Sequence, residues 1–190
     1  EAGLLIQPED QGRQAYDRFR GRVMFPISDR RGRPIAFGGR ILDQGEPKYL
    51  NSPETPLFQK RRNLYGLAEA AEAARVKSTI IVVEGYTDVI ALDQAGLGYA
   101  VAPLGTALTE DQVRLLWRYA SEPYLCFDGD AAGARAAGRA AENMLPILTP
   151  GHGLRFASLP AGQDPDSLVR AGGPEAMQRV LRSEEHTSEL

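Results

Sequence analysis

The chain has 190 residues, of which 43% are hydrophobic and 25% are charged, so it can bury a core and form one domain with part of another. Its single cysteine, Cys126, excludes a disulfide framework and a cysteine-based zinc site, and it fits a reducing, cytoplasmic setting. There is no signal peptide and no apolar run near the ~20 residues that a membrane helix needs, so we expect no membrane partner.

The net charge of -3 combines two oppositely charged segments. Residues 18–62 carry 11 Lys and Arg against 4 Asp and Glu, whereas residues 78–190 carry 8 against 15. A basic segment followed by an acidic one suggests that the first binds a polyanion and the second binds cations. The alternative is two ordinary solvated surfaces that differ in charge.

Residues 21–42 are predicted to form a β-hairpin, because the apolar runs RVMFPIS and PIAFGGRIL flank the turn sequence DRRGR. Gly38 and Gly39 in the second run indicate a bulge or a close approach of another part of the chain. The next segment, GEPKYLNSPETPLFQKRRN, is predicted to be a long ordered loop with basic residues. Tyr49 and Phe58 on this loop could stack on bases, but packing of the loop is the favoured interpretation. LYGLAEAAEAAR is typical of a short helix.

From residue 78 onward, predicted strands and helices alternate. The strands are expected at 79–83, 99–102, 123–127 and 154–158, and the helices at 87–96, 109–120, 131–148 and 172–181. Thr109 and Gln112 have the spacing of a capping box, and Pro174 lies near the first turn of the last helix. Cys126 and Trp117 are predicted to be core residues. This order predicts an α/β fold with a mostly parallel sheet and helices on both of its faces.

Acidic residues follow the predicted strands, at the sheet edge where such folds bind ligands. Each has an ordinary structural explanation when taken alone, such as a turn, a helix cap or a charge at a helix N-terminus. Together they would repel one another unless a cation neutralised them, and Mg²⁺ prefers such oxygen ligands. We therefore expect a metal site at this edge. The acidic residues are Glu84, Asp88, Asp128, Asp130, Asp164 and Asp166.

The segments VVEGYTDVIAL and CFDGDAAG, about forty residues apart, resemble the TOPRIM domain shared by topoisomerases and primases. Four further segments extend the likeness: YDRFRGRVMFPISDRRGRPIAFGGRIL, PKYLNSPETPLFQKRRNLYGL, AVAPLGTALT and LPAGQDPDSLV. With them, the chain from about Tyr16 to Leu181 resembles the catalytic core of bacterial DnaG-type DNA primases. A lone D-G-D would be a weak signal, but this ordered set is specific.

The resemblance implies a partial basic α+β subdomain at 1–77, a TOPRIM domain at 78–160, the start of a C-terminal helical subdomain at 161–182 and an unmatched tail at 183–190. It implies an RNA polymerase that makes short RNA primers on single-stranded DNA from nucleoside triphosphates, by two-metal nucleotidyl transfer with Mg²⁺ or Mn²⁺. Replicative helicase and single-strand-binding protein are the partners expected of the full-length family.

The resemblance also implies roles for single residues. Glu84, Asp128 and Asp130 would be catalytic metal ligands, and Asp88, Asp164 and Asp166 would support that metal site or bind a further ion. Contacts to template, primer or nucleotide would come from Arg40, Lys48, Asn51 and Lys60.

Family members carry a zinc-binding module before this region and a helicase-interacting module after it. We therefore expect zinc only in that N-terminal module and weak activity from the present segment alone. The last eight residues, SEEHTSEL, do not continue the family pattern.

Two other functions use the same acidic site. A TOPRIM nuclease or topoisomerase would break strands, and a non-catalytic DNA-binding TOPRIM module would only hold them. The basic hairpin and the KYLNSPET loop favour a primase, and the full set of acids argues against a passive module. A topoisomerase would also need a nucleophilic tyrosine in a partner domain.

Overall fold

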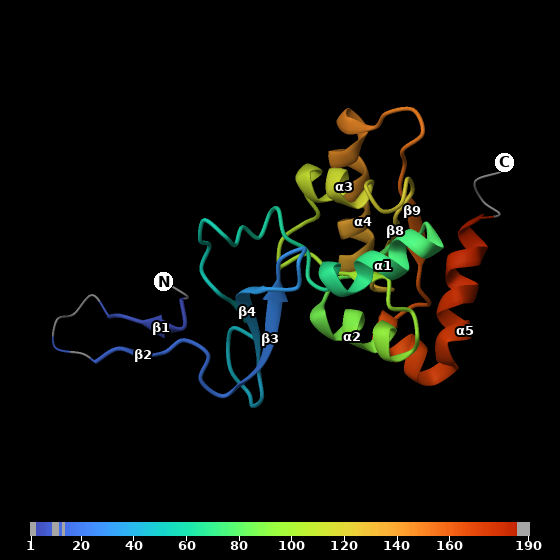
Figure 1. Ribbon diagram of the computed structural model, residues 1–190. Coiled ribbons are helices and arrows are strands. Elements are labelled where there is room, and N and C mark those ends of the chain that lie inside the picture. Colours follow the sequence, from blue (N-terminus) through green and yellow to red (C-terminus); the bar gives the residue numbers. More distant parts are fainter. Residues whose placement is uncertain (1–2, 9–11, 13, 186–190) are drawn as a thin grey trace. The chain divides into compact units, whose positions relative to one another are not determined.

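The computed structural model describes residues 3–8, 12 and 14–185, and its helices and strands are labelled in Figure 1. The chain divides into two compact units, residues 1–59 and residues 60–190. Residues 60–77, which the sequence groups with the basic subdomain, therefore belong to the second compact unit. None of the helices in the described part of the chain combines the length and apolar character needed to cross a membrane.

The first unit contains two antiparallel sheets. Strand β1 (Leu5–Ile6) pairs with β2 (Tyr16–Asp17), and β3 (Arg22–Ser28), β4 (Pro34–Ile41) and β5 (Tyr49–Asn51) form a three-stranded sheet in that order. The predicted hairpin is thus confirmed as β3 and β4. Its turn is closed by Asp29, whose Oδ1 accepts hydrogen bonds from the backbone N–H groups of Arg31 and Arg33 at 2.8 and 3.0 Å.

Strand β5 corrects the prediction of one long loop after the hairpin. It has only three residues and pairs along β4, with Arg40 opposite Tyr49 and Gly38 opposite Asn51. Three residues are too few to show a hydrophobic periodicity, so this strand forms because it pairs with β4. Gly39 shows the expected close approach, because a Cβ there would lie 2.7 Å from Cδ1 of Phe19. The register irregularity of the hairpin lies elsewhere, at Ile27 and Ser28.

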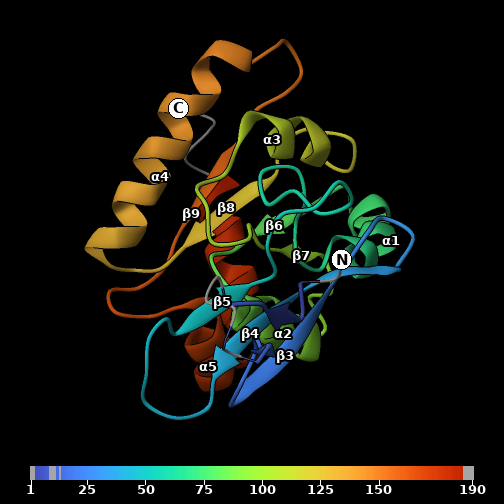
Figure 2. The ribbon, with the colours of Figure 1, turned by 90° about the vertical axis from the view of Figure 1, so that its left-hand side faces the viewer.

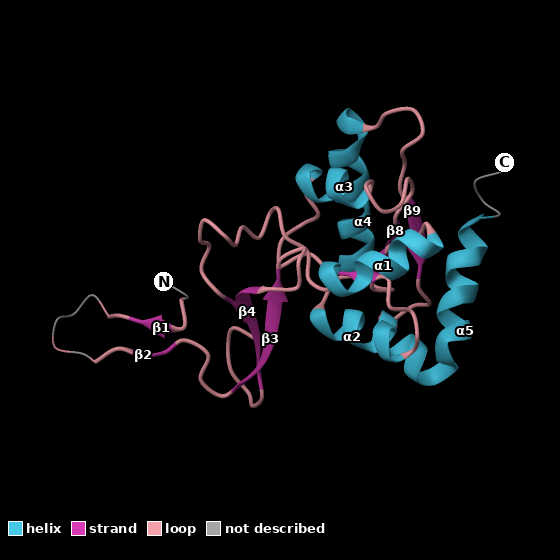
Figure 3. Ribbon diagram, in the orientation of Figure 1, coloured by secondary structure: helices cyan, strands magenta, loops and turns pink. Residues whose placement is uncertain are grey.

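The second unit contains a four-stranded parallel sheet in the order β7-β6-β8-β9. The strands are β6 (Ile81–Val82), β7 (Ala100–Val101), β8 (Tyr124–Phe127) and β9 (Arg155–Ser158). The helices are α1 (Leu67–Lys77), α2 (Tyr86–Gln94), α3 (Glu110–Leu116), α4 (Ala131–Met144) and α5 (Pro165–Glu185), with a 3-10 turn at Leu145–Ile147. Strands and helices alternate along this part of the chain, as the sequence predicts, and Figure 3 distinguishes the two by colour.

Helices cover both faces of this sheet, because each face packs into its own hydrophobic cluster with helix residues. Figure 2 shows the ribbon of the sheet with the helices around it. Ile81 and Val83 point to the cluster that contains residues of α2 and α5. Their neighbours Ile80 and Val82 point to the cluster that contains residues of α1, α3 and α4. The continuous apolar run around β6 is therefore explained by burial on both faces. Cys126 is a buried core residue, as predicted, whereas Trp117 is only half-buried.

Helix α5 begins earlier than the predicted start at residue 172. It starts at Pro165 and is interrupted at Gly173, whose φ of 65° and ψ of -176° are not helical. Pro174 then opens the second part, where its fixed φ suits a first helical turn. Residues from Pro165 onward are thus helical, so an ordinary surface turn does not account for Asp166. Of the unmatched tail, residues 183–185 belong to α5, and residues 186–190 lie outside the described residues.

Candidate functional site

The site begins with two strands that end side by side. In β6 and β8, Val82 is paired with Leu125, so the carboxyl ends of both strands lie at one edge of the sheet. Glu84 follows β6 and Asp128 follows β8, and the backbone N–H of Asp128 donates a hydrogen bond to Oε1 of Glu84 at 3.1 Å. Glu84 and Asp128 can meet only if the two strands are neighbours, and the structure shows that they are.

Asp130 is the N-cap of α4. Its Oδ1 accepts hydrogen bonds from the backbone N–H groups of Ala132 and Gly133 at 2.7 and 2.8 Å. Two of the N–H groups that a helix N-terminus leaves unpaired are thereby satisfied. The cap uses one carboxylate oxygen, so the second oxygen takes no part in it.

Two glycines lock the Asp128–Asp130 loop in place. A Cβ on Gly133 would lie 2.0 Å from the carbonyl oxygen of Asp128, and a Cβ on Gly129 would lie 2.1 Å from that of Pro160. Gly129 also exchanges backbone hydrogen bonds of 2.8 Å with the segment after β9, donating to Gln163 and accepting from Gly162. The loop is therefore tied to the segment that carries Asp164.

Asp88 and Asp164 are also helix-capping residues. Oδ2 of Asp88, which is 7% exposed, accepts a hydrogen bond from the backbone N–H of Gly85 at 3.1 Å. Oδ1 of Asp164 accepts one from the backbone N–H of Ser167 at 2.7 Å, and this hydrogen bond lowers the pKa of Asp164. Helix capping, one of the structural explanations that the sequence offers for single acids, is therefore correct for Asp88, Asp130 and Asp164.

Charge repulsion and burial raise the pKa of two of these acids. The pKa of Asp88 rises to about 7, first because of burial and then because of the charges of Asp128 and Asp164. The pKa of Asp128 rises to about 6, again first through burial, then through Glu84, Asp164 and Asp130. Oδ1 of Asp128 is buried and has no hydrogen-bond partner.

The remaining predicted ligand, Asp166, lies in a different environment. Its carboxylate forms an ion pair with Arg170 one turn along α5. Its backbone N–H, rather than its side chain, interacts with Asp88 and lowers the pKa of that residue. Sequence reasoning did not single out Gln163, whose Oε1 is a second buried oxygen without a partner.

The charges of these acidic residues influence one another's pKa values, but the side chains are not arranged as a complete set of ligands around one ion. Among residues 3–8, 12 and 14–185, no group of three or more His, Cys, Asp or Glu side chains is arranged to hold one ion. Two other features of the acidic residues suit a cation. Carboxylate oxygens are the ligands that hard divalent ions prefer, and Oδ1 of Asp128 is buried without a hydrogen-bond partner. A cavity of about 250 Å³ opens beside Asp128 and Asp130 and is lined mainly by apolar residues of β8, β9 and α4.

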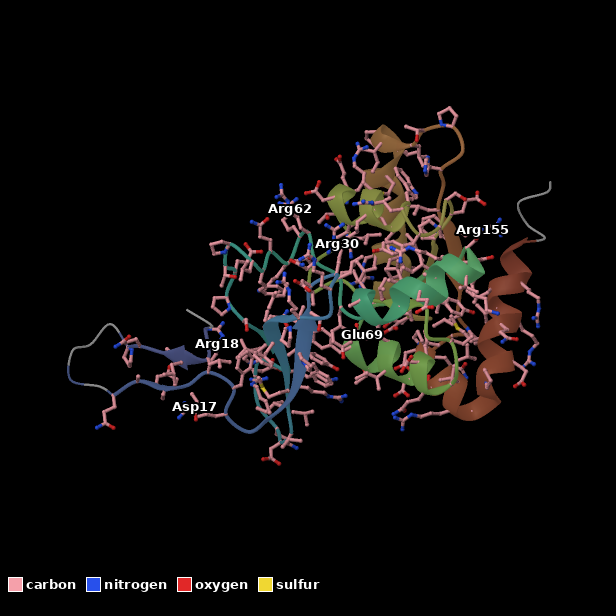
Figure 4. All side chains as sticks on the ribbon, in the orientation of Figure 1. Asp17, Arg18, Arg30, Arg62, Glu69 and Arg155 are labelled. Atoms are coloured by element: carbon pink, nitrogen blue, oxygen red, sulfur yellow. The ribbon has the colours of Figure 1, made fainter. Side chains whose placement is uncertain are left out.

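Three of the four predicted nucleic-acid contacts lie together in the first unit. The guanidinium of Arg40 lies 5.7 Å and the ammonium of Lys48 lies 6.0 Å from the ring centroid of Tyr49. The carbonyl of Asn51 accepts hydrogen bonds of 3.3 and 3.2 Å from Arg18, a basic residue that the sequence left unassigned (labelled in Figure 4).

The two aromatic residues of the basic loop differ. Phe58 is fully buried, which confirms the packing interpretation, whereas Tyr49 is 38% exposed. The fourth predicted contact, Lys60, lies in the second unit, where its backbone carbonyl accepts a hydrogen bond from Nε2 of Gln112 at 3.0 Å.

A parallel sheet in this strand order, with acidic residues at its carboxyl edge, defines a Toprim-type domain, and the Toprim domain family matches residues 78–157. The family described as the DNA primase catalytic core, N-terminal domain, matches residues 1–71. The chain therefore belongs to the family of bacterial DnaG-type DNA primase catalytic cores.

Several relatives agree with this assignment. The chain is 57% identical over 178 residues to the DNA primase of Pseudomonas aeruginosa and 56% identical to that of Escherichia coli K12, covering 94% of its own length in each case. It spans only 27% and 30% of those two proteins. A crystal structure of a DNA primase domain from Pseudomonas aeruginosa superposes with a TM-score of 0.91 at 55% identity, covering 96% of this chain and 57% of that one. A structure described as the DnaG primase catalytic domain bound to ssDNA superposes with a TM-score of 0.87 at 52% identity, covering 96% of this chain and 58% of that one.

Proposed function

We propose that this chain is the nucleotidyl-transfer core of a DNA primase, which joins ribonucleotides into short RNA primers on a single-stranded DNA template. The observation that carries the proposal is the contact between Glu84 and the Asp128–Asp130 loop at the carboxyl edge of the sheet. Relatives that are named DNA primase, and a similar structure described as bound to ssDNA, support it.

The acidic residues would hold Mg²⁺ or Mn²⁺. Glu84, Asp128 and Asp130 would be the principal ligands, and Asp88, Asp164 and Asp166 would support them. When bound, such cations supply positive charge to the phosphate oxygens of the nucleotide and primer.

The protein's own contribution is to place charge rigidly. The cap of α4 fixes Asp130, the Gly129 and Gly133 contacts fix the backbone of the loop, and Glu84 is fixed through the N–H of Asp128. Little covalent chemistry is required of protein groups in phosphoryl transfer, so such placement is the main task of the site. Because the pKa of Asp88 is raised to about 7, its carboxyl group is only partly ionised near neutral pH when no cation is bound.

The basic residues would bind the nucleic acid and the nucleotide. Arg40, Lys48 and Asn51 in the first unit and Lys60 in the second would contact template, primer or triphosphate, mostly through phosphate groups. In the whole protein we expect a zinc-binding module and contacts to the replicative helicase and single-strand-binding protein, in the bacterial cytoplasm.

The test uses a chimera in which this chain replaces the matching segment of the Pseudomonas aeruginosa primase. Incorporation of labelled ribonucleotides on single-stranded DNA is measured with Mg²⁺, with Mn²⁺ and with a chelator. We expect template-dependent and cation-dependent synthesis that Asp128→Asn and Glu84→Gln abolish. Asp93→Asn, an exposed acid of α2, is the control and should retain synthesis. Cleavage of the DNA without synthesis would instead indicate a Toprim nuclease, and binding without either reaction would indicate a passive module.

A further inference from the structure

Helix α3 begins with a capping box that makes more hydrogen bonds than a cap requires. Gln112 is fully buried, and its Oε1 accepts a hydrogen bond from the backbone N–H of Thr109 at 3.0 Å. This contact completes the capping box that the sequence predicts. The cap needs only this oxygen, so the amide nitrogen of Gln112 is available for another purpose.

That nitrogen holds a segment about 50 residues away in the sequence. Nε2 of Gln112 donates to the carbonyl oxygens of Lys60 at 3.0 Å and Asn63 at 2.8 Å. The hydroxyl of Thr109 donates to the carbonyl oxygen of Arg61 at 2.7 Å. Residues 60–63, here called the KRRN segment, are thus fixed at three of their four carbonyl groups by side chains from the start of α3.

The KRRN segment places three consecutive cations on this fixed backbone. The side chains of Arg61 and Arg62 are exposed, and Nε of Arg62 forms an ion pair of 3.1 Å with Oδ2 of Asp111 (Arg62 is labelled in Figure 4). The paired side chains are 67% and 58% exposed, so the ion pair is weak and easily exchanged for another anion. Asp111 therefore holds Arg62 in place without neutralising it permanently.

We propose that Gln112 and Thr109 are positioning residues that fix the KRRN segment for binding to consecutive phosphates of a nucleic-acid strand. The inference rests on the proposed function and deepens it, since it names the ligand chemistry of this segment and the residues that prepare it. A backbone already held in place loses little conformational entropy when its side chains bind. Phosphate contacts by such cations supply affinity that depends on salt.

The test measures binding of a fluorescent single-stranded oligodeoxynucleotide to the 190-residue chain by anisotropy, over a series of salt concentrations. Thr109→Val removes the hydroxyl that holds Arg61, whereas Thr109→Ser keeps it. We expect Thr109→Val to weaken binding about three- to tenfold and to reduce the slope of log K against log salt by about 0.7 for each lost phosphate contact. Thr109→Ser should bind like the original chain.

Two readouts separate positioning from a general loss of structure. Partial unfolding lowers the fraction of binding-competent protein but leaves the salt slope of the folded fraction unchanged. The increase in melting temperature produced by Mn²⁺ should be the same in Thr109→Val and the original chain. If Thr109→Val binds with unchanged affinity and slope, the inference is wrong while the proposed function stands. If the original chain does not bind the oligonucleotide at all, the inference is wrong, and the chimera tests the proposed function separately.

A second pair of variants does not depend on the cap. Asp111→Asn removes the anion that faces Arg62, and Glu110→Gln removes the same charge one residue earlier in the first turn of α3. We expect Asp111→Asn to tighten binding about two- to fivefold and to steepen the salt slope, with a smaller effect from Glu110→Gln. Equal effects of the two variants would refute the proposal that Arg62 binds a phosphate in place of Asp111.

Discussion

Asp88 allows a quantitative prediction about the stability of the chain without bound cations. Its side chain is 7% exposed, and its pKa is raised from 3.8 to about 7 by burial and by the charges of Asp128 and Asp164. The folded chain therefore binds a proton at Asp88 more tightly than the unfolded chain does. The favourable contribution is complete below pH ~4 and is lost as the pH rises from there to about 7.

The size of the effect follows from the shift. About three pKa units correspond to about 4 kcal/mol, which is the upper limit of the folding free energy lost at Asp88 between pH ~4 and pH ~8. Asp88→Asn removes the titration while keeping an oxygen that can accept the hydrogen bond from Gly85. We expect this variant, free of cations, to be more stable than the original chain at pH 8 by about 1–4 kcal/mol and to be nearly equal to it at pH 4.

Urea denaturation in the presence of a chelator, at pH values between 4 and 8, measures the difference between the two chains. Subtracting one curve from the other gives the contribution of Asp88 together with its charge coupling to Asp128 and Asp164. Asp93→Asn on the same helix is the matched control, since that acid is exposed. A difference that does not change with pH, or an Asp88→Asn variant that is less stable at pH 8, would refute the assignment of a buried, charge-crowded carboxyl.

Three further predictions concern the loop and the basic residues. Gly133→Ala should destabilise the chain by on the order of 2–4 kcal/mol in thermal or urea unfolding, because the new Cβ would lie 2.0 Å from the carbonyl of Asp128. Gly138→Ala in the same helix, where nothing lies within 4 Å, should stabilise by about 0.5–1 kcal/mol, and destabilisation by both would contradict the steric argument. Asp130→Asn should keep the cap and the unfolding free energy but lose the Mn²⁺-dependent rise in melting temperature, whereas Asp130→Ala should lose both, by about 1 kcal/mol for the cap. Lys48→Ala should weaken oligonucleotide binding and flatten its salt dependence, and an unchanged salt slope with unchanged nucleotide affinity would exclude Lys48 from the site.

The sequence predicts the second unit better than the first, for a physical reason. Around β6 the apolar run is buried on both faces, and that burial produces a pattern that can be read locally. Strands β1, β2 and β5 are exposed or only partly buried, so their residues carry no comparable apolar pattern. The early start of α5 is likewise hidden, because Asp164 and Pro165 are typical of turns as well as of helix starts.

The sequence predicts the acidic residues of the candidate site but not the contacts that hold them in place. Parallel strands end at one edge, so the order of elements places Glu84 and Asp128 on the same sheet edge. That β6 and β8 are neighbours, which brings the two residues together, is seen only in the structure. The contacts of the glycines could not be predicted from the sequence. The carbonyl of Pro160, which lies close to Gly129, is about thirty residues away in the chain, and only the folded structure shows this contact. The same holds for Gln112. Its capping role can be predicted from the sequence, but its hydrogen bond to the carbonyl of Lys60 cannot.

The helix caps at this site would favour the proposed binding of a cation. A flexible loop with several carboxylates would relieve their repulsion by moving them apart. The caps of α2, α4 and α5, together with the steric limits at Gly129 and Gly133, restrict that movement. Burial first, and this repulsion second, raise the pKa values of Asp88 and Asp128, and a divalent cation could relieve the repulsion by replacing the bound protons. Cation binding should therefore release protons near pH 7, and calorimetric titration with Mn²⁺ in buffers of different ionisation enthalpy should give different heats. Identical heats in all buffers would show that no such protons are displaced.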